Sequence, residues 1–235
     1  MKYEPAVAAV AELIANPARA AMLERLLDGL AYSAGELARE GGVAFSTASS
    51  HLAKLVDGGL VSVEVLGRHR RFRLAGPGVA RALESLALLA TQHTRPSKRD
   101  APRDALLRSG RTCYDHLAGQ LGVAITEALV AQRFLIHGVG TFDITPAGVR
   151  RFAALGIAVG AARAARRGFA LECLDWSERR VHLGGAIGAA LCSQMFALGW
   201  IERAESGRAV MVTEKGRRGL LESLGCLISE VADEA

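Results

Sequence analysis

The sequence predicts a mainly α-helical protein with short β-hairpins. Apolar residues make up 50% of the 235 residues and aromatic residues only 5%. This Ala-, Leu- and Val-rich composition favours helices over a β-sandwich. The apolar residues recur mostly at helical spacing, but the spacing changes to the alternation of strands at residues 60–66 and 71–74. The length suits two domains of ordinary size.

The first predicted helices have clear start signals. An amphipathic helix is expected over residues 5–15. Asn16, followed by proline, caps a second helix over residues 17–29, which ends at a glycine. Ser33 and Glu36 form a capping box that begins a third helix. These signals predict three successive helices in the first 42 residues.

A fourth helix and a hairpin follow. The run AFSTASSHLAKLVDGG predicts a helix with Leu52, Leu55 and Val56 on one face. Two short strands joined by the basic turn GRHR come next, and Pro77 opens a leucine-rich helix. Helices followed by a β-hairpin form a winged helix-turn-helix arrangement, so we assign residues 1–90 to such a domain.

The polar face of the fourth helix is suited to contact double-stranded DNA, because short polar side chains at a helix start can approach base edges and phosphates. The wing arginines would reach phosphates or the minor groove. The predicted DNA-binding residues are Ser46, Thr47, Ser49, Ser50, His51, Lys54, Arg68, Arg70 and Arg71. A net charge of +5 fits a polyanionic partner without requiring one.

Three runs of sequence carry a resemblance to a known family. NPARAAMLERL, ELA and STASSHLAKLVDGGLVSVEVLGRHRRFRL are similar to the ArsR-type (arsenical-resistance repressor) winged-helix regulators over residues 7–75. The resemblance implies a homodimeric repressor that an inducer releases from its operator. It also implies pairing through the first helix and the leucine-rich helix after the wing.

The chain departs from this family where metal-sensing members hold their ions. The run ELAREGG has no cysteine, and GVARALESLALLA lacks the Asp and His of the second usual site. Both metal sites that the resemblance implies are therefore missing. The signal has to be sensed by other means, and the additional C-terminal domain is the candidate.

The second half contains a duplication. We expect a linker at 91–104 and a domain at 105–235 with two repeats, about 111–157 and 173–226. HLAGQLGVA in the first repeat matches HLGGAIGAA in the second, and Phe134-Leu135 matches Trp200-Ile201. Each repeat is predicted to run helix, helix, strand, turn, strand, helix, as in a degenerate winged-helix unit.

A Cys-x-Asp element and a histidine recur in both repeats. The candidate effector residues are Cys113, Asp115, His116, Cys173, Asp175, Trp176 and His182. Cys113, His116, Cys173 and His182 could bind a metal ion. A small-molecule or tetrapyrrole-like pocket, a redox-sensitive thiol and a purely structural role stay open. The three-residue spacing of Cys113 and His116 suits one helix face. If the repeats pack about a pseudo-two-fold axis, the two elements meet.

The sequence favours a regulator over an enzyme. Cys113 with His116 is the compact candidate for a thiol enzyme fused to a DNA-binding module, and an architectural DNA-binding protein without an inducer is a third class. Cys192 and Cys226 lie in apolar context and are expected in the core. No cofactor is assigned. The N-terminus does not resemble a signal peptide and no apolar run is long enough to span a membrane, so a cytoplasmic protein is expected.

Overall fold

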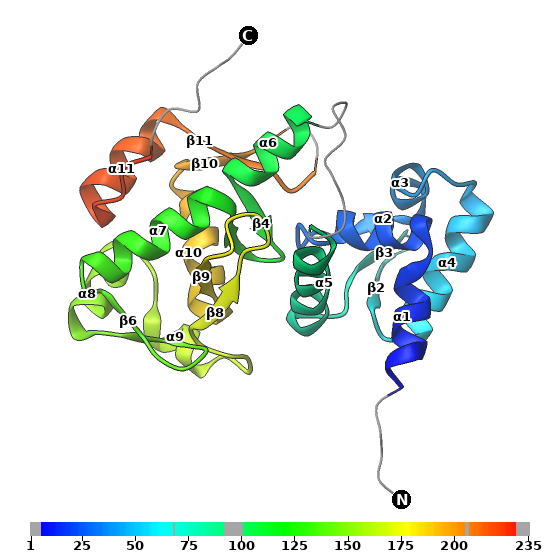
Figure 1. Cartoon of the computed structure of the whole chain (residues 1–235), viewed down its shortest axis with the longest axis horizontal. Helices are drawn as coiled ribbons and strands as arrows, with labels where there is room; N and C mark the ends of the chain where they lie inside the picture. The colour runs from blue at the N-terminus through cyan, green and yellow to red at the C-terminus, as the bar shows by residue number, and fades with distance from the viewer. Residues whose placement is uncertain (1–5, 68, 92–100, 205–206, 229–235) are drawn as a thin grey trace, which may run out of the picture. The chain divides into compact units, whose positions relative to one another are not determined.

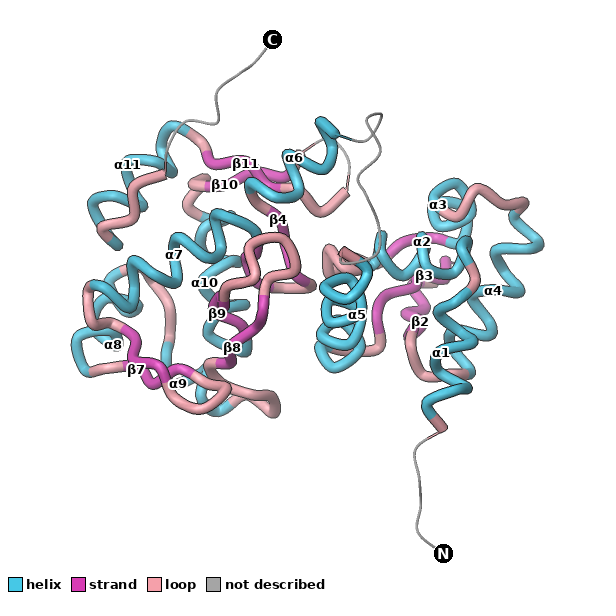
Figure 2. Tube along the Cα trace, in the orientation of Figure 1, coloured by secondary structure: helices cyan, strands magenta, loops and turns pink. Residues whose placement is uncertain are grey.

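The computed structural model describes residues 6–67, 69–91, 101–204 and 207–228 (Figure 1). It contains two compact units, residues 1–83 and 84–235, which are described separately. Helices joined by short antiparallel strand pairs make up both units (Figure 2).

The first unit is a winged helix-turn-helix domain. Besides its helices it has a three-stranded antiparallel sheet, in which the second strand of the wing lies between the first strand of the wing and a short strand that follows the second helix. Its elements are α1 (Val7–Ala15), α2 (Pro17–Leu26), β1 (Tyr32–Ser33), α3 (Ala34–Glu40), α4 (Phe45–Asp57), β2 (Val61–Leu66) and β3 (His69–Leu74). The helices agree with the sequence prediction within three residues. The second strand of the wing is longer than expected, because β3 includes His69 and Arg70 from the predicted turn.

Local capping explains where the helices of this unit begin. The Asn16 side chain accepts a hydrogen bond from the Arg19 backbone N–H at 3.2 Å. Ser33 and Glu36 form both halves of the predicted capping box. Each bond satisfies a backbone group that a helix end leaves without an intrahelical partner.

Helix α5 (Pro77–Ala90) follows the wing. Helix α6 (Ala101–Ser109) begins inside the stretch that the sequence indicated as a linker, so that stretch ends earlier than expected. Residues 92–100 of the expected linker lie outside the described residues.

The second unit contains two repeats with the same order of elements: hairpin, helix, hairpin, helix. The first has β4 (Arg111–Cys113), β5 (His116–Ala118), α7 (Gly119–Ala131), β6 (Leu135–His137), β7 (Phe142–Ile144) and α8 (Pro146–Ala154). After α9 (Val159–Ala164), the second has β8 (Leu171–Leu174), β9 (Val181–Gly184), α10 (Gly185–Ala197), β10 (Ile201–Arg203), β11 (Val210–Val212) and α11 (Glu214–Leu224).

The predicted first helix of each repeat was wrong, because a hairpin stands there. In the first repeat Tyr114 adopts a left-handed φ of 63°, which reverses the chain between β4 and β5. The Thr112 backbone N–H then bonds to the carbonyl of Arg208 in the second repeat at 2.9 Å. The strand is therefore fixed by a partner distant in sequence, which a local pattern does not reveal.

The two repeats share detailed backbone geometry, which supports duplication. Thr145 begins α8 and Thr213 begins α11, and each hydroxyl accepts from a glycine N–H three residues later, at 3.0 and 2.9 Å. The same hydroxyls donate to the carbonyls of Arg133 and Gly199, in the turns that follow α7 and α10, at 2.8 and 2.7 Å. Gly119 and Gly185 begin the central helices with φ values of 73° and 77°.

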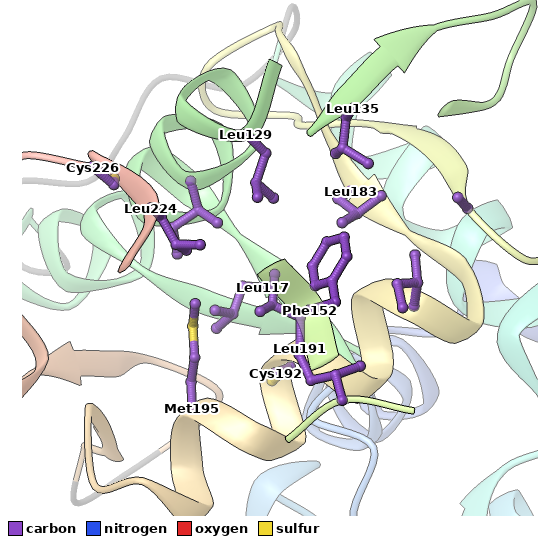
Figure 3. Packing of buried hydrophobic residues seen from close by; sticks show 14 of the residues in the cluster. Leu117, Leu129, Leu135, Phe152, Leu183, Leu191, Cys192, Met195, Leu224 and Cys226 are labelled. Atoms are coloured by element: carbon purple, nitrogen blue, oxygen red, sulfur yellow. The ribbon is translucent and has the colours of Figure 1, made fainter. Parts of the chain in front are cut away.

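The repeats interlock around one core. Helix α7 packs on β9 of the other repeat, and α10 packs on β5. Figure 3 shows side chains from both repeats meeting there. Phe152, which is fully buried, lies in a cluster with residues of both copies: Leu117, Leu129, Leu135, Leu183, Leu191, Met195 and Leu224. Neither repeat could bury this apolar surface alone.

Candidate DNA-binding surface and cysteine–histidine cluster

Helix α4 separates an apolar face from a polar one. Ala48, Leu52 and Leu55 are fully buried in the first unit. The exposed side chains include those of Ser46, Thr47, Ser49, Ser50 and Lys54 from the predicted set. The helix is anchored through its apolar face, so these polar groups face outward.

His51 has a different environment from the rest of the predicted set. It is half-buried, and its Nδ1 lies 3.5 Å from Arg19 Nη1. Arg19 also donates to the backbone carbonyls of Glu12 and Leu13, which fixes the end of α1. Burial, followed by the positive charges of Arg19 and Lys54, lowers the pKa of His51 below its usual value of 6.5.

The wing presents cations beside α4. His69, Arg70 and Arg71 are exposed on β3, whereas predicted Arg68 lies outside the described residues. Arg71 donates to the carbonyl of Ala31 at 3.0 Å, and the Arg70 guanidinium lies 5.9 Å from the Phe72 ring centre. A cleft of about 610 Å³ is lined by residues of both α4 and β3, among them Ser49, Arg70 and Arg71.

Phe45 lines the same cleft and was missed by the sequence analysis. It is 63% exposed at the first position of α4. A large aromatic side chain at the start of a serine-rich recognition helix is the signal that could have identified it. An apolar side chain there can contact a thymine methyl group.

In the second unit, four predicted residues converge. One donor atom from each of Cys113, His116, Cys173 and His182 lies within 4.8 Å of the others, and all four residues are buried. The two Sγ atoms are 4.0 Å apart. The two imidazole rings are stacked with centroids 5.1 Å apart and an interplanar angle of 27°.

The hairpins bring this cluster together. Cys113 is the cross-strand partner of His116 between β4 and β5, and Cys173 is the partner of His182 between β8 and β9. The expectation that Cys113 and His116 share a helix face was therefore wrong. The two-residue turn in one hairpin and the longer loop in the other lead to the same cross-strand pair, which explains why the Cys-to-His spacing differs between repeats.

An aspartate stands beside each histidine. Asp115 Oδ1 lies 3.4 Å from His116 Nδ1, and Asp175 Oδ2 lies 3.8 Å from His182 Nδ1. Arg167 forms a bidentate pair with Asp115. Burial by itself raises the pKa of Asp115, but His116 and Arg167 lower it overall.

Asp175 is the more buried of the two carboxylates. It accepts from Arg111 Nη2 at 2.9 Å and from the Gly119 backbone N–H at 2.6 Å, and Arg111 is fully buried. Burial raises the pKa of Asp175, but Arg111 first and then Ser177 and the backbone donors lower it overall. Arg111 and Arg167 were not identified from the sequence, because neither lies in the matched motif.

The other predicted residues of this unit have packing contacts. Trp176 covers the Arg111 guanidinium, which lies 4.5 Å from its ring centre. Cys192 and Cys226 are buried in the shared core, as expected. Two further cavities lie in this unit, of about 490 Å³ beside Glu127 and 400 Å³ beside Arg167, and neither is lined by a residue of the cluster.

Cys113 and Cys192 are poor nucleophiles. The neighbouring Cys173 thiol and burial raise the pKa of Cys113 to about 12, and burial raises the pKa of Cys192 to about 12. Burial by itself lowers the pKa of His116, but Cys113 and Asp115 raise it overall. A reactive cysteine requires a low pKa and solvent access, and Cys113 has neither.

The helices and wing of the first unit, with a polar recognition helix beside exposed arginines, define a winged helix-turn-helix DNA-binding protein. Residues 14–64 match a helix-turn-helix domain family. The HTH-type transcriptional regulator YdfF of Bacillus subtilis is 40% identical over 213 residues, covering 91% of this chain and 94% of the relative. This chain belongs to the family of HTH-type transcriptional regulators.

Shorter relatives match the N-terminal part. The HTH-type transcriptional regulator CmtR of Mycobacterium tuberculosis is 37% identical over 111 residues, covering 46% of this chain and 93% of the relative. A solved homodimeric winged helix-turn-helix domain, Mb0332 from Mycobacterium bovis, is described as a possible ArsR-family regulator. It is 29% identical, covers 40% of this chain and 94% of that one, and has a TM-score of 0.35. Across the described residues, no helix combines the length and apolar character of a membrane span.

Proposed function

We propose that this transcriptional regulator is an ArsR-type homodimeric repressor that binds its operator through α4 and the wing. The observation that carries this proposal is the cleft shared by α4 and β3. The exposed Ser49 and the wing arginines Arg70 and Arg71 line it together, so one surface offers a hydrogen-bonding group for bases and positive charge for phosphates. The sequence resemblance over residues 7–75 supports the same assignment.

Exposed apolar helices support dimerisation. Helix α1 has the apolar sequence VAAVAELIA but no buried residue within the chain. Leu86 and Leu89 on α5 are also exposed. These are the two helices through which the resemblance implies pairing, and a second copy of the chain is the partner that would cover them.

The second domain is the proposed effector domain, and the cysteine–histidine cluster is its proposed site. The raised thiol pKa and the burial of Cys113 argue against the thiol-enzyme alternative. An effector that binds one arrangement of the repeats more tightly shifts the population toward that arrangement, which is the requirement for inducer control.

The test is selection of duplexes from a random DNA pool by the full-length protein, followed by affinity measurements and sedimentation. We expect one enriched inverted-repeat sequence bound by a dimer, at least about 10³-fold more tightly than random DNA at fixed salt. Equal affinity for selected and random DNA would contradict sequence-specific regulation and favour an architectural role.

A further inference from the structure

The cluster has unused hydrogen-bonding capacity where a folded protein rarely leaves any. His116 Nε2 and both ring nitrogens of His182 are buried without a hydrogen-bond partner among the described residues. A buried polar atom without a partner costs about 1–3 kcal/mol. Such atoms therefore indicate a bound group that satisfies them.

The donor set identifies the chemistry of that group. Two cysteine sulfurs and two imidazole nitrogens form the S₂N₂ set that binds zinc-like ions tetrahedrally. Hard cations such as Mg²⁺ and Ca²⁺ use oxygen ligands instead. We propose that Cys113, His116, Cys173 and His182 bind a single divalent ion of the zinc class. This names the class of effector for the site in the proposed function, and its regulatory part rests on that function.

The spacing fits one ion. With Zn–S near 2.3 Å, two tetrahedral thiolates lie about 3.8 Å apart, and the two Sγ atoms here are 4.0 Å apart. No pair among the four donor atoms exceeds 4.8 Å, so a small contraction brings all four to bonding distance of one point. Two thiolates also balance the two positive charges of the ion, which suits a buried site.

The surroundings orient the ligands. Nδ1 of His116 is hydrogen-bonded to Asp115 at 3.4 Å, and Nδ1 of His182 lies 3.8 Å from Asp175, too far for a hydrogen bond but on the carboxylate side of the ring. We therefore assign Nε2 of each ring to the ion. A carboxylate behind a metal-bound histidine fixes the ring and raises its basicity. Arg167 and Arg111 hold these carboxylates in place. The space beside His116 Nε2 is kept open by Gly184, where a Cβ would lie 3.2 Å from that atom.

Each repeat supplies one cysteine and one histidine, so the ion would tie the two repeats together. Four protein ligands leave no open position, which is typical of a structural or sensing site and not of a catalytic one. Loading or loss of the ion would change how firmly β5 and β9 are held against each other. The ion would then bind one arrangement of the repeats more tightly than another, and regulation of DNA binding requires such a difference in affinity.

The experiment uses full-length protein, reduced and freed of metal with a chelator, and titrated anaerobically with Co²⁺. We expect one Co²⁺ per chain, with the visible bands of tetrahedral cobalt and a thiolate-to-cobalt charge-transfer band, both abolished by Zn²⁺. X-ray absorption of the zinc-loaded protein should give two Zn–S bonds near about 2.3 Å and two Zn–N bonds near about 2.0–2.1 Å.

Matched variants assign the ligands. Cys113→Ser, Cys173→Ser and His182→Gln should each abolish the tetrahedral spectrum, whereas Cys192→Ser and His137→Gln should preserve it. Asp115→Asn should weaken binding by about 10–100-fold. Circular dichroism confirms that each variant folds. The X-ray absorption measurement is made on the wild-type protein, so the proposal is still tested if a variant misfolds.

Other outcomes overturn the proposal. These are an oxygen-only coordination sphere or a tetrahedral spectrum that survives in Cys113→Ser. DNA affinity is measured separately with and without Zn²⁺. A metal site that leaves DNA affinity unchanged would keep the ligand assignment and contradict the effector role in the proposed function.

Discussion

His116 and His182 come from different repeats, and their rings stack with centroids 5.1 Å apart. Glycines on the two central helices make this approach possible. A Cβ at Gly188 would lie 2.3 Å from the Leu183 carbonyl oxygen and 3.3 Å from His116 Cβ, and one at Gly122 would lie 2.4 Å from the Leu117 carbonyl. The glycine at the equivalent position of each repeat thus lets the central helix pass close to a carbonyl of its own hairpin, beside the histidine of the other repeat.

The first prediction is that Gly188→Ala destabilises the second unit by about 1–3 kcal/mol, because the added methyl overpacks a rigid backbone contact. Both tryptophans of the chain, Trp176 and Trp200, belong to this unit, so tryptophan fluorescence during urea unfolding reports on it. Gly160→Ala on α9 is the control, since its Cβ meets nothing within 4 Å. Equal effects of the two substitutions would refute the close-approach argument.

A second prediction concerns Thr126, which joins the repeats by a buried hydroxyl. Its Oγ1 donates to the Gly122 carbonyl at 2.8 Å and accepts from the Leu183 backbone N–H at 2.9 Å. Thr126→Val keeps the volume and leaves that N–H without an acceptor, so we expect a loss of about 1–3 kcal/mol in the same unfolding assay. Thr126→Ser retains the hydroxyl and should lose less. A valine variant as stable as the serine variant would contradict the role of the bond.

The sequence predicted the first unit well because its signals are local. Asn16 and Ser33 satisfy backbone groups within three residues, and the capping partners are visible in the sequence itself. The first hairpins of the two repeats in the second unit were missed for the opposite reason. Their strands are three or four residues long, too short for a period, and Thr112 is paired with a residue of the other repeat.

The cluster could be anticipated because duplication relates equivalent residues. The repeated Cys-x-Asp and His elements indicated which side chains correspond, and packing of one repeat on the other then brings them together. The residues that support the cluster were not accessible in this way. Arg111 and Arg167 lie outside the matched motif. Each is placed by a carboxylate distant in sequence, which the local pattern does not indicate.

A third prediction tests the wing. If Arg70 and Arg71 contact phosphates, replacing either with alanine should weaken binding to all duplexes about equally. The slope of log affinity against log salt should fall by about 0.9 for each lost contact. Arg150→Ala on α8 removes the same charge from an exposed position in the second unit and should leave the slope unchanged. An unaltered slope in both wing variants would remove the wing from the interface.

A fourth prediction concerns pH and His51. Its pKa in the free protein lies below 6.5, so the ring is mostly neutral at pH 7. Because the unfolded chain takes up this proton more readily than the folded one, folding stability falls as the pH drops below 6.5 toward the lowered pKa of His51. DNA phosphates favour the charged ring instead. DNA affinity should therefore rise as the pH falls from 7 toward 6, with proton uptake on binding.

The measurement is DNA affinity at constant ionic strength across this pH range. His51→Gln should flatten the profile, because glutamine has a similar hydrogen-bonding reach but does not titrate. The same profile in His51→Gln and the wild type would show that His51 does not lie close enough to phosphate to sense it.

The last prediction separates base reading from phosphate binding on α4. Ser49 and Ser50 are exposed and Ser49 lines the cleft, whereas Lys54 lies one turn further along the helix. Ser49→Ala or Ser50→Ala should reduce discrimination between the selected operator and random DNA by about 1–3 kcal/mol for each lost base contact. Lys54→Ala should lower affinity for both duplexes by the same factor, because a phosphate contact carries no direct sequence information. Both affinities are measured at one salt concentration by fluorescence anisotropy. If the serine variants keep full discrimination and Lys54→Ala loses it, the base-reading residues lie elsewhere than on this face of α4.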